Sequence, residues 1–334
     1  MKENKKIEII QLLRLIGAIS IIIYHSGIVG EHGYFAVEIF CILSGYILMY
    51  STQKESSIQG FLKKRILRIV PLYWISTIFM YLLLLVAPQL SIMAEAKPEY
   101  LLKSMFFIPF FNSKGYGVPI LGIGWTLNYE MFFYLIFFVA LHISHKLRGL
   151  ITSAVILVLV ALHYILDLDY LIWNYYTDAF MLEFVFGILA FYAMDWLKFR
   201  VQNPFVKYSL LALSALCFLW MCLDIGVNTN ILRCIRLGVP ALLFFMIIIA
   251  CFEKNTYPKL LISYGNATFS IYLLEYFSTA AYKVIANYLP LALDIIVFIL
   301  MMLCTLFMGY LTYKYVELPL YNKLQNIRIR GIID

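Results

Sequence analysis

The sequence is poor in charged residues. Of its 334 residues only 13% are Asp, Glu, Lys or Arg, whereas 63% are hydrophobic. A soluble domain carries about 25% charged residues. The shortage of charge therefore excludes a water-soluble globule, a disordered chain and a fibrous repeat, and it favours a chain that has lipid as its solvent.

Motifs of several common enzyme classes are also missing. The chain has no GxxxxGK[ST] phosphate loop, no GxGxxG, no GxSxG nucleophile elbow and no HExxH zinc pair. Its six cysteines include no CxxC pair. The sequence therefore indicates neither a disulfide framework nor a metal site, and it implies no ATP-driven chemistry.

Long apolar stretches are what the sequence does have. None of them alternates polar and apolar residues as the strands of a membrane barrel do, so each predicts a transmembrane helix. Ten stretches lie near residues 9–27, 33–51, 70–88, 119–141, 150–166, 176–194, 207–224, 237–252, 266–286 and 291–314. We therefore predict an all-α bundle of about ten transmembrane helices.

The positions of Lys and Arg predict the orientation of this bundle. With the N-terminus in the cytoplasm, 19 of the 26 basic residues fall on the cytoplasmic side and five on the other side. Such a bias is typical of membrane proteins, so the formal charge of +7 does not point to nucleic acid. We predict that both termini are cytoplasmic. Arg14 interrupts the first apolar run, which favours a retained helix over a cleaved signal peptide.

The connection from about residue 89 to 118 is the longest between predicted spans. It contains an apolar piece, Tyr100 to Phe111, that is too short to cross a bilayer. We expect a re-entrant or interfacial helix there. An ordinary cap over the bundle explains the piece equally well.

Two ionisable residues share the first predicted helix. Arg14 and His25 are eleven positions apart, which places them on one helical face about 16 Å apart along the axis. Ionisable groups inside a membrane are costly and usually functional. The face would offer a cation near the cytoplasmic side and a titratable base near the outer side. The simpler interpretation of His25 is a structural hydrogen-bonding group.

Glu38 lies in the first turn of the second predicted helix, near the level of His25. A carboxylate next to an imidazole would orient it and raise its basicity. The alternative is that Glu38 only compensates the dipole at the N-terminus of its helix.

Four basic residues stand together in the segment FLKKRILRIVP. They are Lys63, Lys64, Arg65 and Arg68. One interpretation is a topology signal that also contacts anionic lipid. The other is an anion site for a phosphorylated cofactor, because guanidinium groups match phosphate geometry. The residues alone leave both open.

Polar residues also cluster where the fourth predicted helix begins. They are Trp125, Thr126, Asn128, Tyr129 and Glu130. An aromatic belt accounts for Trp and Tyr but not for Glu130. Two further acids, Glu183 and Glu275, lie inside the sixth and ninth spans. Pairing with Arg or Tyr inside the bundle explains them equally well.

Six segments together resemble the acyltransferase-3 family of integral membrane acyltransferases, in the family's order and over nearly the whole chain. They are the Arg14–His25 pair, GYFAVEIFCILSGY, FLKKRILRIVP, WTLNYE, GNATFSIYLL and YVELP. The resemblance implies that an acyl group, usually acetyl, passes from cytoplasmic acyl-CoA to a hydroxyl of a surface glycan or lipid-linked sugar.

The resemblance also implies roles for particular residues. His25 would be the catalytic histidine, Arg14 its companion, and Glu38 and Glu130 acidic groups near the reaction centre. The cofactor-binding residues would be Lys64, Arg65, Arg68 and Tyr73, and the residues that contact the acceptor would be Ser44, Trp125, Asn128 and Tyr129. Relatives often carry His where this chain has Glu275, so the role of that position stays open.

We therefore predict one transmembrane acyltransferase domain over residues 1–334, without an appended soluble domain, in the plasma membrane. Acetyl-CoA would be the donor, and the partners would be membrane lipid, a glycan acceptor and other polysaccharide-assembly proteins. The rival interpretation is a transporter or flippase for a lipid-linked sugar or small anion. The chain shows no inverted repeat and no paired Gly/Pro-broken spans, which are the usual signs of a transporter. A receptor or scaffold is a third interpretation, in which His25 has no chemical role.

Overall fold

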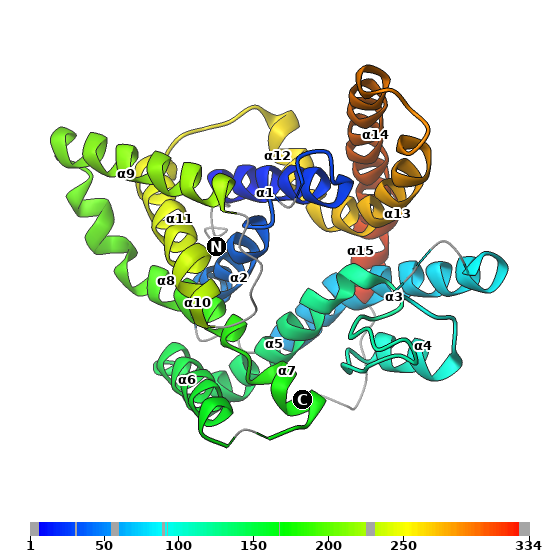
Figure 1. Ribbon diagram of the computed structural model, residues 1–334. Coiled ribbons are helices and arrows are strands. Elements are labelled where there is room, and N and C mark those ends of the chain that lie inside the picture. The colour runs from blue at the N-terminus through cyan, green and yellow to red at the C-terminus, as the bar shows by residue number, and fades with distance from the viewer. Residues whose placement is uncertain are drawn as a thin grey trace. The chain divides into compact units, whose positions relative to one another are not determined.

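The computed structural model describes residues 7–30, 32–54, 60–88, 91, 93–166, 168–224 and 231–326, and every regular element in these ranges is a helix (Figure 1). The predicted all-α fold class is confirmed. The helices group into two compact units, each built from two separate parts of the chain. Unit 1 comprises Met1–Ile58 with Tyr129–Gly265, and unit 2 comprises Gln59–Asn128 with Asn266–Asp334.

Unit 1 is built around the close pair α2 (Ala36–Ser51) and α8 (Leu182–Arg200). Two glycines bring the two backbones into contact. A Cβ on Gly187 would lie 2.0 Å from the carbonyl oxygen of Ile42, and a Cβ on Gly45 would lie 2.2 Å from that of Phe184. Glycine at a helix crossing permits this approach in membranes.

The remaining helices of unit 1 surround this pair. Helix α1 (Glu8–Ser26) packs on α2, and α11 (Val239–Phe252) packs on α2, α8 and α9. The other elements are the part of α5 (Trp125–Ile143) from Tyr129 onward, α6 (Arg148–Leu166), α7 (Leu171–Tyr176), η4 (Ala179–Met181), α9 (Pro204–Leu223), α10 (Ile231–Arg233), the π-helical segment η5 (Cys234–Gly238) and α12 (Lys259–Asn266).

Unit 2 is built around α13 (Thr268–Ala286), which packs along α14 (Leu291–Thr312). Helix α3 (Phe61–Val86) contacts α13, the short helix α4 (Pro98–Met105) and the terminal helix α15 (Leu318–Asn326). The indole N–H of Trp74 donates to the Met105 carbonyl oxygen at 2.8 Å and ties α4 to α3. The unit also contains η3 (Gly122–Gly124) and the π-helical segment η6 (Tyr313–Glu317).

Eight helical stretches of the described residues are long and apolar enough to cross a membrane. They match eight of the ten predicted spans and confirm a multi-pass membrane protein. The helices at the second and ninth predicted spans do not meet this criterion of length and apolar character. Helix α2 has 16 residues, and at 1.5 Å per residue it is about 24 Å long, less than a bilayer core. Helix α13 has 19 residues but includes Glu275, Lys283 and several hydroxyl side chains. Which side the termini face stays a prediction.

The long connection carries one short helix, α4, at Pro98–Met105. Eight residues rise only about 12 Å, so α4 cannot cross a bilayer. Leu102 and Phe106 are 58% and 63% exposed, as expected of residues that contact lipid at an interface. Phe107, two residues after the end of α4, has a positive φ of 59°. The expected helix therefore ends six residues before Phe111.

Candidate functional site

Helix α1 of unit 1 carries both Arg14 and His25. His25 lies in the last turn, and the helix ends because Gly27 adopts the left-handed conformation (φ 78°) and donates its N–H to the Tyr24 carbonyl oxygen at 3.1 Å. Arg14 donates to the side-chain oxygen of Gln11 at 3.4 Å. Both predicted residues are half-buried.

Glu38 on α2 is paired with an arginine from a distant part of the chain. Arg233 donates from Nε and Nη2 to Glu38 Oε1, at 2.8 and 2.5 Å. Both side chains are buried, with exposed fractions of 5% and 0%. The guanidinium also lies over the rings of Tyr34 and Phe180, 4.6 and 5.0 Å from their centroids. Buried charges persist when they are paired and hydrogen-bonded in this way.

Sequence reasoning missed Arg233 and counted it among the five basic residues on the non-cytoplasmic side. In the structure Arg233 is 6% exposed and ends α10, immediately before the π-helical segment η5. π-helical turns are rare in proteins, and those that occur are often found at functional sites. The only signal in the sequence was an arginine beside a predicted span, which is also what an ordinary topology signal looks like.

Glu183 on α8 is a second buried acid in unit 1. It is 0% exposed, and neither of its carboxylate oxygens has a hydrogen-bond partner among the described residues. It lies within electrostatic range of Glu38 and Arg233. Burying a carboxyl group without a hydrogen-bond partner is costly. The structure does not show the expected pairing of Glu183 with an Arg or Tyr, because the nearby Arg233 donates its hydrogen bonds to Glu38.

Glu130 on α5 accepts two hydrogen bonds within unit 1. Ser44 of α2 donates its hydroxyl to Glu130 Oε1 at 3.0 Å, and the Tyr134 hydroxyl donates to the same oxygen. The structure thus brings together Ser44 and Glu130, which the family resemblance had assigned to the acceptor and to the reaction centre. Tyr129, the neighbour of Glu130, is buried and stacks on Tyr175 with ring centroids 4.3 Å apart.

The basic cluster lies inside α3 of unit 2, because this helix begins at Phe61 rather than near residue 70 as predicted. Lys64 is exposed, whereas Arg65 and Arg68 are half-buried and one turn apart on the same side of the helix. The Arg65 guanidinium lies over the Phe61 ring at 5.6 Å. Two guanidinium groups on one helical face are suited to a phosphate-bearing ligand.

Tyr73 is also on α3 but is buried inside unit 2, with an exposed fraction of 0%. Its ring stacks on Phe107, with centroids 5.0 Å apart. A Cβ on Gly124 would lie 2.5 Å from the Tyr73 hydroxyl oxygen, so only glycine fits there. Tyr73 therefore packs directly against the start of α5, where Trp125 is half-buried and Asn128 is 3% exposed.

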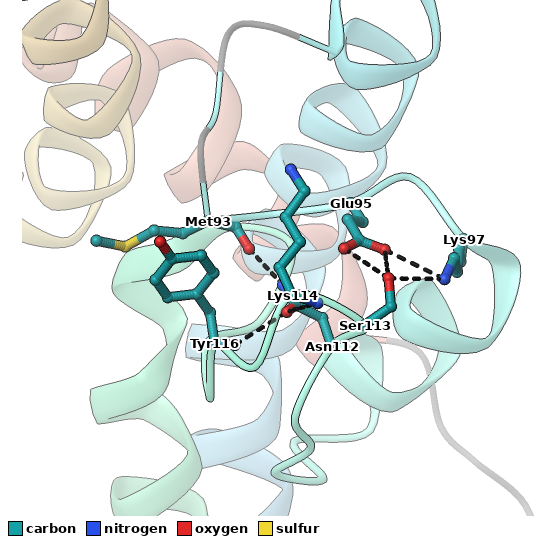
Figure 2. A network of polar contacts seen from close by, with 7 residues as sticks. All are labelled: Met93, Glu95, Lys97, Asn112, Ser113, Lys114 and Tyr116. Atoms are coloured by element: carbon teal, nitrogen blue, oxygen red, sulfur yellow. Dashed lines mark hydrogen bonds and ion pairs between the residues drawn. The ribbon is translucent and has the colours of Figure 1, made fainter.

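In the connection that leads to α5, polar contacts join residues near 93–97 to residues near 112–116 (Figure 2). Asn112 Oδ1 accepts from the backbone N–H groups of Lys114 and Tyr116, both at 3.0 Å, and its amide donates to the Met93 carbonyl oxygen. The Ser113 hydroxyl donates to the Glu95 carboxylate at 2.6 Å. This hydrogen bond holds the pKa of the Glu95 carboxyl below its ordinary value. Residues of the connection between 93 and 116 are thus held together within unit 2.

Acids and thiols in the described residues form no cluster of three or more that would hold a metal ion. All six cysteines lie within this part of the chain and are free thiols. Two pairs of buried or half-buried polar groups in unit 1, Arg233 with Glu38 and Ser44 with Glu130, can supply acid–base and electrostatic chemistry.

The fold and these buried groups define a multi-pass membrane protein with an ionisable site inside its helices. A family model described as an acyltransferase domain matches residues 7–314. The chain belongs to the acyltransferase-3 family and is therefore an enzyme that transfers acyl groups.

One curated relative is the exopolysaccharide production protein ExoZ of Rhizobium meliloti (strain 1021). It is 32% identical to this chain over 263 residues, which cover 76% of this chain and 78% of the relative. No solved structure matches the chain.

Proposed function

We propose that this protein moves an acetyl group from cytoplasmic acetyl-CoA to a hydroxyl of a cell-surface or lipid-linked polysaccharide. Membership of the acyltransferase family supports an acyl donor, and the name of the relative, an exopolysaccharide production protein, supports a glycan acceptor. The observation that carries the proposal is a half-buried histidine in the last turn of α1, inside the residues that the family model matches.

His25 is the proposed base. The imidazole takes the proton of the acceptor hydroxyl while the oxygen attacks the thioester carbonyl carbon. The carbon–sulfur bond breaks, CoA leaves as its thiolate, and the imidazolium returns the proton to the sulfur. The end of α1 stabilises the transient positive charge on His25. A covalent acyl-imidazole is the other route, and mass spectrometry of the quenched enzyme after mixing with acetyl-CoA alone separates the two.

Arg65 and Arg68 are the proposed contacts for the phosphates of CoA. Their guanidinium groups share one face of α3, and each can form two parallel hydrogen bonds to phosphate. The exposed Lys64 adds a point charge to this face. Arg68→Ala is expected to raise KM for acetyl-CoA about tenfold and to leave kcat nearly unchanged. Lys63→Ala is the control, because the Lys63 ammonium donates to the Gln325 carbonyl oxygen at 3.2 Å.

The O-acyl ester content of surface glycans tests the whole proposal. Cells that lack the gene are complemented with wild type, with His25→Ala or with His142→Ala, at matched membrane levels. His142 is the control because it is exposed and contacts the Phe138 carbonyl oxygen of its own helix. Esters are expected with wild type and His142→Ala only, and their added mass identifies the acyl group.

Two outcomes contradict the proposal. If His25→Ala restores as much ester as wild type, His25 is not the base. If wild type restores the glycan phenotype without any added ester, the polysaccharide is not the acceptor, and the transporter interpretation explains the phenotype better.

A further inference from the structure

The connection between α1 and α2 lies directly on the last turns of α1. Gly33 has a φ of +102°, and a Cβ there would lie 2.8 Å from the Ser20 carbonyl oxygen and 3.4 Å from the Tyr24 Cβ. A side chain at this position would be both strained and in contact with backbone. Gly33 thus brings the residue that follows it, Tyr34, against the end of α1.

A line of aromatic rings runs from this connection to His25. The Tyr34 ring meets the Tyr24 ring edge to face, with centroids 5.0 Å apart and an interplanar angle of 63°. The Tyr24 ring lies 5.3 Å from the His25 imidazole. Edge-to-face pairs at this distance are attractive and directional, so the position of Tyr34 restricts where Tyr24 and the imidazole can lie.

Arg233 fixes the far end of this line. Its guanidinium lies 4.6 Å from the Tyr34 ring centroid and 5.0 Å from the Phe180 ring centroid. Two hydrogen bonds to Glu38 set its orientation. A planar guanidinium stacks on rings and binds carboxylate at the same time. A lysine would keep the positive charge but would lose the stacking on the rings.

We infer that Arg233 is a positioning residue for His25, acting through Tyr34 and Tyr24. The inference rests on the proposed function in one respect, namely that His25 is the reacting base. All four side chains belong to unit 1, so the argument concerns one compact part of the molecule. A simpler role for Arg233, holding α2 to α10, leaves the imidazole unaffected and is what the experiment must separate.

The test compares purified variants in detergent: four single substitutions described here, the combination of the first two, and His25→Ala. Tyr34→Leu removes the ring but keeps the Arg233–Glu38 pair, and Arg233→Lys keeps the charge but loses the stacking. Tyr34→Phe is the conservative variant and should restore wild-type behaviour, because it keeps both ring contacts. Arg148→Lys is the matched control, since Arg148 is another buried arginine of unit 1 and donates instead to Thr52 and to the carbonyl oxygens of Met49 and His145.

We expect Tyr34→Leu and Arg233→Lys each to lower kcat by about tenfold to a hundredfold, since small displacements of a reacting group have effects of this size. KM for acetyl-CoA should stay within about twofold, because the proposed phosphate contacts, Arg65 and Arg68, are unchanged in these variants. The two substitutions combined should lower kcat no further than the stronger one alone, since they act on one path.

The second readout is the reaction of His25 with diethyl pyrocarbonate, measured peptide by peptide by mass spectrometry. His142 of the same protein is the internal reference. Tyr34→Leu and Arg233→Lys should change the His25 rate relative to His142 at least about threefold, whereas Tyr34→Phe and Arg148→Lys should not.

A purely structural role predicts other results. If all losses of activity follow the amount of folded protein, or if the His25 rate is the same in every variant, Arg233 does not position His25. If instead the His25 rate shifts as expected but His25→Ala remains fully active, the positioning holds and the proposed base is wrong. The two failures are therefore distinguishable.

Discussion

Substitution of Gly187 by alanine tests the packing on which unit 1 depends. The added Cβ would lie 2.0 Å from the Ile42 carbonyl oxygen, 2.8 Å from the Tyr46 backbone nitrogen and 2.9 Å from the Gly45 Cα. All three are backbone atoms, so no side-chain rotation relieves the contact. Ordinary contacts begin near 3.4 Å, and α2 and α8 would have to separate locally by about 1.4 Å to accommodate the methyl group.

The cost follows from that displacement. Overpacking a well-filled interior usually costs about 1–3 kcal/mol, and a contact with backbone on all sides lies at the upper end. Alanine favours the helix by about 1 kcal/mol over glycine. The net loss of stability should be about 2 kcal/mol, which corresponds to a decrease in Tm of about 4–8 °C for a unit of this size.

A thiol-reactive fluorophore in a thermal ramp measures this decrease. Cys41 and Cys234 are buried and react only when unit 1 opens, whereas Cys304 is exposed and gives the starting signal. Gly17→Ala is the matched control in helix α1. A Cβ at Gly17 would lie 3.0 Å from the far end of the Phe40 side chain, which can move aside, and at an ordinary contact distance of 3.8 Å from the Ala36 Cβ.

Gly187→Ala should therefore lower Tm more than Gly17→Ala does. Gly17→Ala should change Tm by less than about 2 °C, because the helical gain and the small contact offset each other. If Gly187→Ala unfolds at the temperature of wild type, the two backbones do not touch at this crossing. A loss of similar size in both variants would attribute the effect to glycine itself rather than to the α2–α8 contact.

Three further predictions concern the buried pair and the ordered connection. Glu38→Gln leaves Arg233 charged and unpaired, at a cost of about 3–5 kcal/mol. Its yield of monodisperse protein on size exclusion should fall severalfold, and an unchanged yield would contradict the buried pairing. Asn112→Ala removes hydrogen bonds worth about 1 kcal/mol each, so amide exchange at residues 112–116 should accelerate while α13 keeps its protection. The Ser113 hydrogen bond lowers the pKa of Glu95, so its contribution is complete at pH 7, begins to fall below the ordinary value of 4.5, and is lost below the lowered pKa. Amide exchange of the connection should therefore accelerate only in acid, and Glu95→Gln should remove this pH dependence.

The helices could be predicted from the sequence because each depends on its own residues. Length and hydropathy located all ten stretches, and the structure has a helix in each. The predicted start of α3, near residue 70, was too late, because the first turns of this helix contain the basic cluster and therefore do not resemble a transmembrane span. The length of the connection before α5 could be predicted, but the left-handed conformation of Phe107 (φ 59°) could not, since no glycine marks it.

The candidate site was only partly predictable, because pairing between distant residues leaves no local pattern. Arg14 and His25 could be placed on one helix from their spacing, and α1 contains both. Glu38 was expected to orient His25, whereas its described hydrogen bonds are with Arg233, 195 positions away. Likewise, the contact of Ser44 with Glu130 joins residues 86 positions apart.

That separation has a consequence for biogenesis. Glu38 enters the membrane with one of the first helices, and its arginine is synthesised 195 residues later. At about 5–20 residues per second, the ribosome needs about 10–40 s to cover that distance. Throughout this interval Glu38 lies in an apolar helix without its counter-charge, a state that a protonated carboxyl or a protective insertase can sustain. The completion of unit 1 thus waits for α10, and no shorter fragment of the nascent chain contains the finished pair.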